Sequence, residues 1–499
     1  MSEQSDCISA MQRMAIIAQP ERSGGVASTT ETAPQPYRFQ PLAGTVWQDR
    51  FILNFYDNDP SAGILDWDCS QWTYDNHYAT DILIRGFAEQ DIGVPVFAAL
   101  DGVVAYAHDG ENDRNTTLEG QPANCVILQH QGTHQSWYWH LRKGSVAVAV
   151  GEEVKAGTQI GQVGSSGHSW MPHLHFESRF DGYAYEAYSG PCHPGPQHWV
   201  NQTSIPRHTW ISEFAMHDSN SIPIAQFYPQ NPPRTGTFVR TGAAQPIGAW
   251  YVIHNEPESS VWRARYLRPD GTTGFDSGTR TLNNESSRFA AHWFSFALAP
   301  DTNGAWTLEL SVNGQVLMIA PFLVIDAGAI PVNRSPLRPA AIAFDPLAPT
   351  TNDAIFCRLT VPPLQDPDYD VVSYEYNWII AGLCYRRVTN AALADAIPRG
   401  AALPGDAIRC VVTPYDGRQF GTPIEATIPG AIRPSLDIRN IADNRVVISW
   451  PTSAAGYVLQ SASAAAWSNV TAKAFRSGTA MALTNEATGS ARFFRLISP

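Results

Sequence analysis

The sequence predicts an all-β protein with several folded domains. Its 499 residues are too many for one compact core, and 37 glycines and 37 prolines are spread along the chain, as is typical of many short strands joined by turns. Apolar and polar residues alternate in Ala305–Gly314, which places Trp306, Leu308 and Leu310 on one face of a strand. Long helical patterns are scarce. We therefore expect three or four β-domains.

The N-terminal residues 1–36 are rich in Ser, Thr, Pro and Gln, and we expect them to be disordered or loosely attached. They have no basic start and only a very short apolar stretch, so they do not form a convincing secretory signal. The first folded domain is expected at residues 37–211. Its end is marked by the Pro- and Gly-rich stretch Ser189–Ser204, which is typical of a loop.

Four histidines and one aspartate in the first domain have the character of a metal site. His77 and Asp81 stand in NHYATD, His140 in SWYWHL, and His173 and His175 in MPHLHFES. Residues at i and i+2 of a strand share a face, so the last pair can point into one site. A hydrolytic zinc site needs about three imidazole or carboxylate ligands and an open position for water. The histidines left over could transfer protons near neutral pH.

The sequence around these residues resembles the lysostaphin/LytM-type zinc metallopeptidases. Five signatures occur in the order of that family: HxxxD, VxAxxxGxV, YxHL, GxxVxxGxxIGxxG and HLHFE. The resemblance implies an antiparallel-sheet zinc metallopeptidase domain that cleaves peptide bonds of bacterial peptidoglycan, in the cross-bridge or between stem residues. It assigns His77, Asp81 and His175 as the ligands of Zn²⁺ and His140 and His173 as the catalytic residues.

The resemblance covers roughly residues 45–180 and departs from the family at two positions. Ala79 stands where HxGxD has glycine, and Met171 precedes the proline where a small residue is common. Neither change removes a ligand. No HExxH motif is present, so proton transfer must come from the remaining histidines or another nearby group. Glu177 lies on the strand face of the HxH pair, and is either a supporting residue of the site or a solvated or ion-paired residue.

Three β-domains are expected after the first. Residues 212–330 form a β-sandwich with a hairpin at the Asn-Gly pair of LSVNGQVL. Residues 331–431 begin with a Pro-rich linker, Pro331–Pro339, and resemble an immunoglobulin domain, because Cys357, Trp378 and Cys410 have the spacing of that fold. We expect a disulfide between these two cysteines. Residues 432–499 resemble the small β-sandwich modules at the ends of secreted bacterial proteins.

The other cysteines and a run of aspartates leave alternatives open. Cys69 and Cys125 can pair with each other or with Cys192, and no CxxC motif indicates thiolate ligation of a metal. Cys7 and Cys384 are expected to be unpaired. The remaining candidate is a calcium site, with a solvated loop as the alternative, at three aspartates: Asp366, Asp368 and Asp370.

The net charge of −13 argues against nucleic acid or an anionic membrane surface as an electrostatically attracted partner. No run of 18 apolar residues is present, so no membrane span is expected. We expect a monomer with a peptidoglycan peptide as its substrate. Disulfides and a wall substrate both favour an extracellular or periplasmic location. The alternatives to an active enzyme are a non-catalytic wall-binding regulator and a surface adhesion protein that keeps the peptidase fold.

Overall fold

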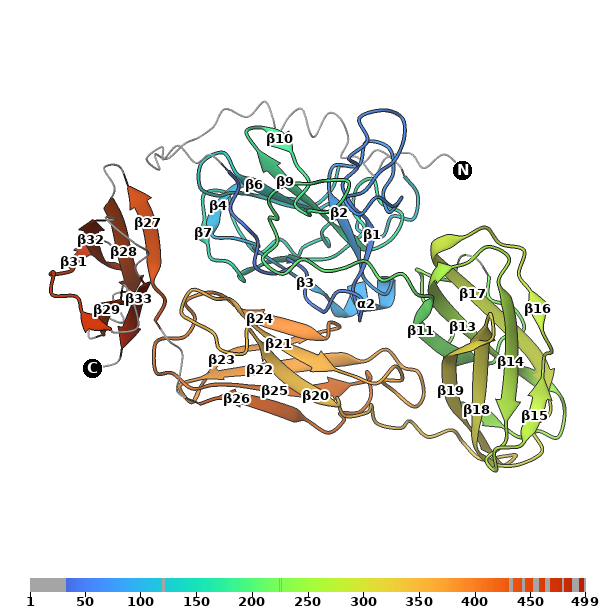
Figure 1. The fold of residues 1–499 in the computed structure, drawn as a ribbon. Helices are drawn as coiled ribbons and strands as arrows, with labels where there is room; N and C mark the ends of the chain where they lie inside the picture. The colour runs from blue at the N-terminus through green and yellow to red at the C-terminus, as the bar shows by residue number, and fades with distance from the viewer. Residues whose placement is uncertain are drawn as a thin grey trace.

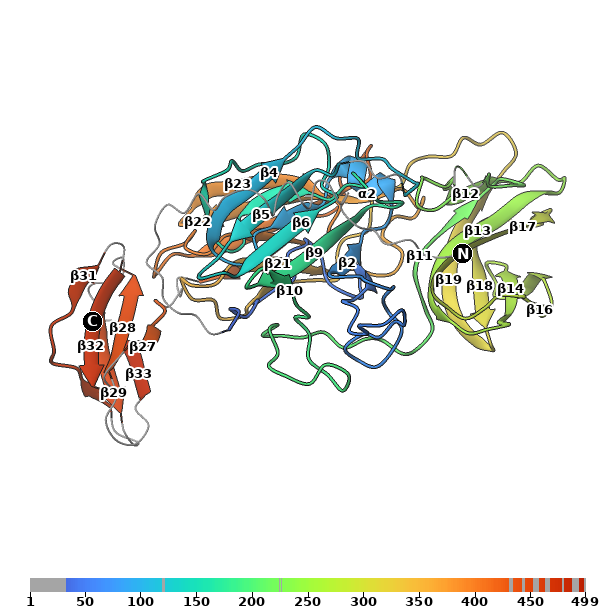
Figure 2. The ribbon, with the colours of Figure 1, turned by 90° about the horizontal axis from the view of Figure 1, so that it is seen from above.

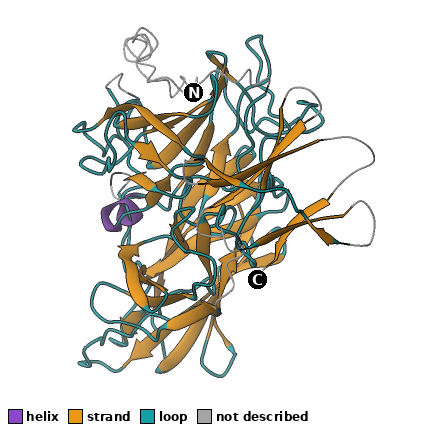
Figure 3. Ribbon diagram, turned by 90° about the vertical axis from the view of Figure 1, so that its left-hand side faces the viewer, coloured by secondary structure: helices purple, strands orange, loops and turns teal. Residues whose placement is uncertain are grey.

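The computed structural model describes residues 33–118, 122–223, 225, 227–429, 434–441, 445–451, 457–462, 467–477, 480–486 and 493–497. Within them the chain is almost entirely β-structure, with one short helix, α2 (Phe87–Ile92) (Figure 3). The all-β prediction is confirmed. The strands group into four modules, which we number in chain order. The second and fourth modules lie at opposite ends, and the first and third are stacked between them (Figure 1, Figure 2). The predicted domain boundaries remain predictions.

The first module is a large antiparallel sheet backed by a small one. Its strands are β1 (Phe51–Asn54), β2 (Thr80–Leu83), β3 (Pro95–Phe97), β4 (Gly102–His108), β5 (Cys125–Gln129), β6 (Gln135–Trp139), β7 (Glu153–Val154), β8 (Gln159–Gln162), β9 (His173–Phe180) and β10 (Tyr183–Ala184). The large sheet has the order β1-β2-β9-β6-β5-β4-β7, with β10 paired to β9, and β3 pairs with β8 in the small sheet.

Strand β9 is buried along nearly its whole length because both faces of the sheet are covered there. Leu174 and Phe176 belong to the hydrophobic core of the module. The alternate residues His173, His175 and Glu177 lie on the opposite face, since successive side chains of a strand point to opposite sides. The predicted shared face of the HxH pair therefore exists, and it is the polar face of the central strand.

The second module is a sandwich of two sheets. Its strands are β11 (Trp210–His217), β12 (Thr237–Val239), β13 (Gln245–Glu256), β14 (Val261–Leu267), β15 (Thr273–Asp276), β16 (Arg280–Thr281), β17 (Ser287–Leu298), β18 (Gly304–Val312) and β19 (Gln315–Ile325). One sheet is β11-β13-β17, and the other is β12-β19-β18-β14-β15, with β16 paired to β14. The predicted hairpin is confirmed: Asn313 and Gly314 have φ of 47° and 80° between β18 and β19.

The third module is also a two-sheet sandwich. Its strands are β20 (Ala341–Asp345), β21 (Ile355–Thr360), β22 (Ser373–Ile380), β23 (Leu383–Asn390), β24 (Ala394–Ile397), β25 (Ile408–Tyr415) and β26 (Ile424–Ile428). The sheets have the orders β20-β21-β24 and β23-β22-β25-β26. Cys357, Trp378 and Cys410 all lie in the core between them.

The expected Cys357–Cys410 disulfide is wrong, because the structure holds both residues as free, buried thiols. The Cys-Trp-Cys spacing placed the two cysteines correctly in one core, yet position alone does not determine the oxidation state. Burial and the neighbouring Cys357 thiol raise the pKa of Cys410 far above its usual value, so the Cys410 thiol stays protonated. The disulfide that does form joins Cys69 to Cys192, while Cys125 is buried and free and Cys384 is exposed and free. Cys7 lies outside the described residues.

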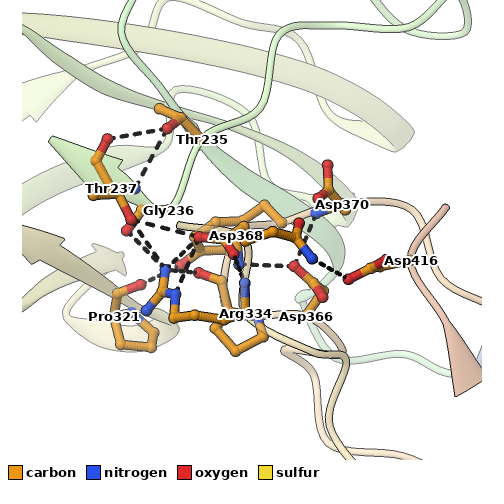
Figure 4. A network of polar contacts seen from close by, with 12 residues as sticks. Thr235, Gly236, Thr237, Pro321, Arg334, Asp366, Asp368, Asp370 and Asp416 are labelled. Carbon is orange, nitrogen blue, oxygen red and sulfur yellow. Dashed lines mark hydrogen bonds and ion pairs between the residues drawn. The ribbon is translucent and has the colours of Figure 1, made fainter. Parts of the chain in front are cut away.

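The joint between the second and third modules contains a polar network (Figure 4) beside Tyr369, which packs into the second module's core. Arg334 forms an ion pair with Asp368 at 2.7 Å, and its Nη2 also donates to the carbonyl oxygens of Gly236 and Pro367. In the described part of the chain, the only His, Cys, Asp or Glu cluster with ligand atoms within 4.8 Å of one another lies in the first module. Asp366, Asp368 and Asp370 do not form such a cluster, and Arg334 neutralises the middle carboxylate, so the calcium site stays a prediction.

The fourth module is the smallest. Its strands are β27 (Asp437–Ile441), β28 (Arg445–Pro451), β29 (Val458–Ala462), β30 (Ser468–Asn469), β31 (Phe475–Ser477), β32 (Ala480–Glu486) and β33 (Phe493–Ile497). They form the sheets β27-β28-β32-β31 and β30-β29-β33 around a core that contains Ile448 and Leu483. Across the whole described chain, no helix is both long enough and apolar enough to span a bilayer.

Candidate metal centre and active site

The sheet register brings the five predicted site residues together. Asp81 on β2 lies opposite His175 on β9, and His175 also lies opposite Trp139, the last residue of β6. His140 follows Trp139 directly, and its left-handed backbone (φ 64°) breaks the alternation of the strand, so its ring lies on the same side as His175, with the two centroids 5.6 Å apart. All five side chains are almost completely buried, with exposed fractions of 1–3%. Three adjacent strands, β2, β9 and β6, therefore bring together residues that lie up to about a hundred positions apart in the sequence.

His77, Asp81 and His175 form a compact set of ligand atoms. His77 Nε2 lies 3.1 Å from Asp81 Oδ2, and His175 Nδ1 lies 2.9 Å from Asp81 Oδ1. One ligand atom from each residue lies within 4.8 Å of the others. Two imidazoles and one carboxylate around a common point are the donor set that Zn²⁺ takes in hydrolases, and they leave a position open. The residues present therefore fit zinc.

Backbone carbonyls fix three of the imidazole rings. The Nδ1 atoms of His77, His140 and His173 lie 2.6, 2.7 and 2.8 Å from the carbonyl oxygens of Phe55, Ser166 and Met171. A carbonyl oxygen only accepts, so each Nδ1 must carry the hydrogen and each Nε2 then presents a lone pair. Outer hydrogen bonds of this kind set the tautomer and the ring orientation.

The His140–His173 pair lies beside the ligand set. Their ring centroids are 4.6 Å apart, and His140 is 5.6 Å from the ring of His175. The Nε2 atoms of His140, His173 and His175 are buried but make no hydrogen bond within the described residues. His140 also has a φ of 64°, a left-handed conformation that costs energy for a non-glycine residue and is often found at functional sites. These nitrogens are available to a bound group.

The electrostatics keep the Asp81 carboxylate charged and favour the neutral form of the His140 and His175 imidazoles. Burial alone would raise the pKa of Asp81, but His77 and the hydrogen bond from His175 hold it well below its usual value. Burial is the main reason that the pKa of His140 is lowered well below its usual value, and the neighbouring His173 and His175 add to the effect. Burial also lowers the pKa of His175. An ionised carboxylate with neutral imidazoles is the protonation state that metal binding requires.

Asn54 is a site residue that the sequence analysis missed. It ends β1 opposite Asp81, is 5% exposed, and donates from Nδ2 to Asp81 Oδ2 at 2.9 Å. A donor on a ligand carboxylate orients that carboxylate. The signal was weak: a polar residue at the end of the apolar strand FILN. Only the register of β1 against β2 shows that this asparagine faces the aspartate.

Glu177 and the polar loop after Asp109 both lie beside the site. Glu177 is fully buried, its Oε1 pairs with Arg179 and its Oε2 lies 4.0 Å from His175 Nε2, so it is an ion-paired residue next to the site and not a solvated one. In the loop, Asn115 donates from Nδ2 to the carbonyl of Gly167 at 2.7 Å. The loop therefore contacts the residue next to Ser166, whose carbonyl oxygen holds His140.

The sheet and the buried His/Asp cluster define a metallopeptidase type of domain. Residues 76–187 match the family model described as Peptidase family M23. The first module is thus a domain of peptidase family M23, which confirms the predicted lysostaphin/LytM-type resemblance. The matched stretch contains all five site residues and ends before the second module.

The curated relatives match over the same part of the chain. Glycyl-glycine endopeptidase ALE-1 of Staphylococcus capitis is 35% identical over 109 residues, which cover 22% of this chain and 26% of the relative. Lysostaphin of Staphylococcus simulans is 33% identical over 22% of this chain and 19% of its own. Peptidoglycan DD-endopeptidase ShyA of Vibrio cholerae is 38% identical over 17% of each. The chain thus matches about a quarter or less of the length of these relatives.

The solved structures include the catalytic domain of lysostaphin from Staphylococcus simulans. It is 28% identical, with 28% of this chain and 88% of that domain covered and a TM-score of 0.18. A zinc-containing peptidase from Vibrio cholerae is 19% identical over 33% of this chain and 41% of its own, with a TM-score of 0.22.

Proposed function

We propose that the first module is a zinc-dependent endopeptidase that hydrolyses peptide bonds of bacterial peptidoglycan. The observation that carries the proposal is the burial of five convergent side chains in one site: His77, Asp81, His140, His173 and His175. Three of the curated relatives support the substrate class, since they are named for glycyl-glycine or peptidoglycan endopeptidase activity. The bond is either in the cross-bridge or between stem residues.

His77, Asp81 and His175 would hold the metal. When bound, zinc supplies Lewis acidity that lowers the pKa of a water molecule and polarises a carbonyl group. Asn54 orients Asp81 through its hydrogen bond to Oδ2, and Phe55 orients His77 through its carbonyl oxygen. These contacts hold the ligands in place before the metal arrives, which reduces the reorganisation that binding requires.

His140 and His173 would act on the substrate. Each directs Nε2 into the site because Nδ1 is bonded to a backbone carbonyl. Neutral imidazole can accept a proton from the attacking water and return it to the leaving amine, and the protonated ring can stabilise a developing oxyanion. The lowered pKa of His140 means that this ring begins the reaction unprotonated near pH 7. The assignment of base and acid between the two histidines stays open.

The cellular setting follows from the same proposal. Peptidoglycan lies outside the cytoplasmic membrane, and the Cys69–Cys192 disulfide suits an oxidising compartment. We therefore place the protein in the extracellular space or the periplasm. A monomer is sufficient, because all of the proposed ligands and catalytic residues come from one chain.

The test is digestion of purified sacculi from several bacteria with different cross-bridges, with zinc present or chelated. Mass spectrometry should identify fragments with new amino termini that disappear with the chelator and with His173→Ala. The exposed histidine variant His208→Ala is the matched control and should cleave like the wild type. Asp81→Asn should lose bound zinc, whereas His173→Ala should keep it. Zinc binding without any cleavage would overturn the proposal and favour a wall-binding regulator or an adhesion protein.

A further inference from the structure

Met171 stands at the position where the sequence departs from its family, and its carbonyl group holds a proposed catalytic histidine. The carbonyl oxygen accepts a hydrogen bond from His173 Nδ1 at 2.8 Å and another from Ser169 Oγ at 2.9 Å. Ser169 Oγ also lies 3.4 Å from His173 Nδ1, so the Met171 oxygen is the nearer partner and its position sets the tautomer and the orientation of the His173 ring. Whatever fixes Met171 also fixes His173.

The side chain of Met171 lies in a buried cluster of the first module that residues of the second module cover. It is 1% exposed and forms a small buried cluster with Phe51 and Leu83. Among the aromatic residues packed against this cluster, Tyr228 and Phe289 also pack against the core of the second module. These two residues therefore connect the core of the second module to the Met171 cluster beside the site.

Polar contacts hold the same interface in register. Tyr228 Oη donates to the carbonyl of Ile84 at 3.1 Å, and the backbone N–H of Phe87 donates to the carbonyl of Pro229 at 2.9 Å. Ile84 also donates from its backbone nitrogen to the carbonyl of Pro172, the residue between Met171 and His173. The second module is thus connected to the segment before His173 through side chains and through main chain.

His140 provides an internal comparison. Its Nδ1 also meets a carbonyl, that of Ser166, but the residues that fix Ser166 belong to the first module. Ser166 Oγ accepts from the backbone N–H of Asn124 at 3.0 Å and donates to the carbonyl of Leu141 at 2.9 Å. The two histidines have the same kind of support, yet only the support of His173 reaches the second module.

We infer that Met171 is a positioning residue and that the second module, through Tyr228 and Phe289, controls the orientation of His173. The second module is then a working part of the site and not a spacer beside it. The catalytic consequence rests on the proposed peptidase function, whereas the control of the His173 ring does not.

The first test uses NMR of the full, zinc-loaded chain with ¹⁵N-labelled histidine. In Met171→Ala and Phe289→Ala, the Nδ1 hydrogen of His173 should exchange with solvent about tenfold faster, because its acceptor is no longer held. The Nδ1 hydrogen of His140 should keep its rate. Matched controls are Phe296→Ala on the same strand β17 and Met318→Ala in the second module's core, since neither residue belongs to the Met171 cluster.

The second test is kinetic, with a pentaglycine peptide or a cross-linked muropeptide dimer as the soluble probe. Met171→Ala and Phe289→Ala should lower kcat about 10-fold or more, with KM and bound zinc unchanged, because small displacements of a catalytic group are costly. Met171→Leu should restore most of the rate. Equal faster exchange at His140 and His173, or no change at either, would overturn the inference. If the wild type cleaves no probe, the proposed function fails, and the exchange rates still decide whether the second module controls His173.

Discussion

The first module meets its two neighbours in different ways. Towards the second module it presents a cluster with three fully buried residues, Phe51, Leu83 and Met171, next to the proposed catalytic histidines. Towards the third module it has no separate interface, because one hydrophobic core runs through both. That core takes in residues of the third module: Ala354, Phe356, Ala391, Ala392, Ala394 and Ala396.

The two interfaces therefore differ in role: the one with the third module stabilises the fold, and the one with the second module positions His173. The alanines of β24 and the residues before it have small side chains, so the strand can approach the first module closely. The backbone N–H of Ala391 donates to the carbonyl of Gly93 at 3.0 Å, which continues the contact in the main chain. None of these groups contacts a site histidine. We therefore expect changes at this interface to alter stability, and changes near Met171 to alter the site.

The largest effect is expected for Phe356→Ala. Phe356 is 2% exposed and lies 4.8 and 5.8 Å from the rings of Phe39 and Phe97 of the first module. Loss of a buried phenylalanine costs about 3 to 5 kcal/mol. Calorimetry should show a lower unfolding temperature for the first and third modules together. The control Phe344→Ala weakens the third module's own core and, because the shared core couples the two modules, should lower the same joint transition. A separate first-module transition that is unchanged in Phe344→Ala would mean that the shared core is not cooperative.

A second prediction concerns a part of the first module that touches neither neighbour's interface. Burial raises the pKa of Glu186 from 4.5 to about 8, and its Oε2 makes no hydrogen bond within the described residues. The folded state therefore holds the proton more tightly, so this contribution to stability is complete below pH 4.5 and is lost as the pH rises towards 8. Glu186→Gln should stabilise the protein by a free energy on the order of 3 kcal/mol at pH 8 and by little at pH 4.5.

Denaturant unfolding across this pH range measures the effect of Glu186→Gln. The exposed variant Glu153→Gln serves as the control and should follow the wild-type profile. If Glu186→Gln stabilises the protein equally at pH 4.5 and pH 8, the pKa of Glu186 is not raised in the folded state. The result would also separate a burial effect inside the module from the two interface effects.

The motifs allowed the sequence to predict the site, but the interfaces could not be predicted. His77, Asp81, His140, His173 and His175 are polar residues in a strongly patterned context, so their convergence could be inferred before the structure was known. Met171 and Phe356 are apolar residues like many in any core, and nothing local indicates which module they will face. Asn54 needed the strand register, because a single asparagine carries no signal of its partner.

The cysteines of the third module show the same limit in another form. The pattern of Cys357, Trp378 and Cys410 correctly indicated side chains that meet in one sandwich core. It did not indicate a bond, since packing and oxidation state are separate properties of a cysteine pair. Sequence patterns therefore predicted which face a residue lies on better than which partner it takes.

A third prediction tests a buried charge at the shared core. Asp49 is fully buried, and its Oδ2 accepts a hydrogen bond from the backbone N–H of Leu393 at 2.8 Å. Its Oδ1 accepts from the backbone N–H of Thr45 at 2.7 Å. Asp49→Ala leaves both donors unsatisfied and should cost about 2 to 3 kcal/mol. Arg38→Ala removes only an exposed ion pair with Asp353 across the same interface, and about 0.5 kcal/mol is expected. Urea unfolding measures the loss of unfolding free energy in both variants. Equal losses would mean that the hydrogen bond from Leu393 to Asp49 does not stabilise the interface.

The smallest effect comes from a pair of glycines with the same backbone conformation. Gly157 and Gly151 have φ of 85° and 89°, so alanine at either position pays the same left-handed cost of about 1 kcal/mol. A Cβ on Gly151 would meet nothing within 4 Å, whereas a Cβ on Gly157 would lie 2.6 Å from Cβ of Ala354 in the third module.

The difference between Gly157→Ala and Gly151→Ala therefore isolates the closeness of the two modules. Gly157→Ala should destabilise the protein by about 1 kcal/mol more, because overpacking forces the backbone of one module away from the other. The double variant Gly157→Ala with Ala354→Gly removes the nearest clashing atom and should recover part of that difference in unfolding free energy, because Pro398 Cα and Ile397 O still lie 3.1 and 3.2 Å from the new Cβ. The rate of peptide cleavage should be the same in all of these variants, since the displaced groups lie at the interface that stabilises and not at the one that positions His173. A loss of kcat in Gly157→Ala without a loss of stability would reverse the roles assigned to the two interfaces.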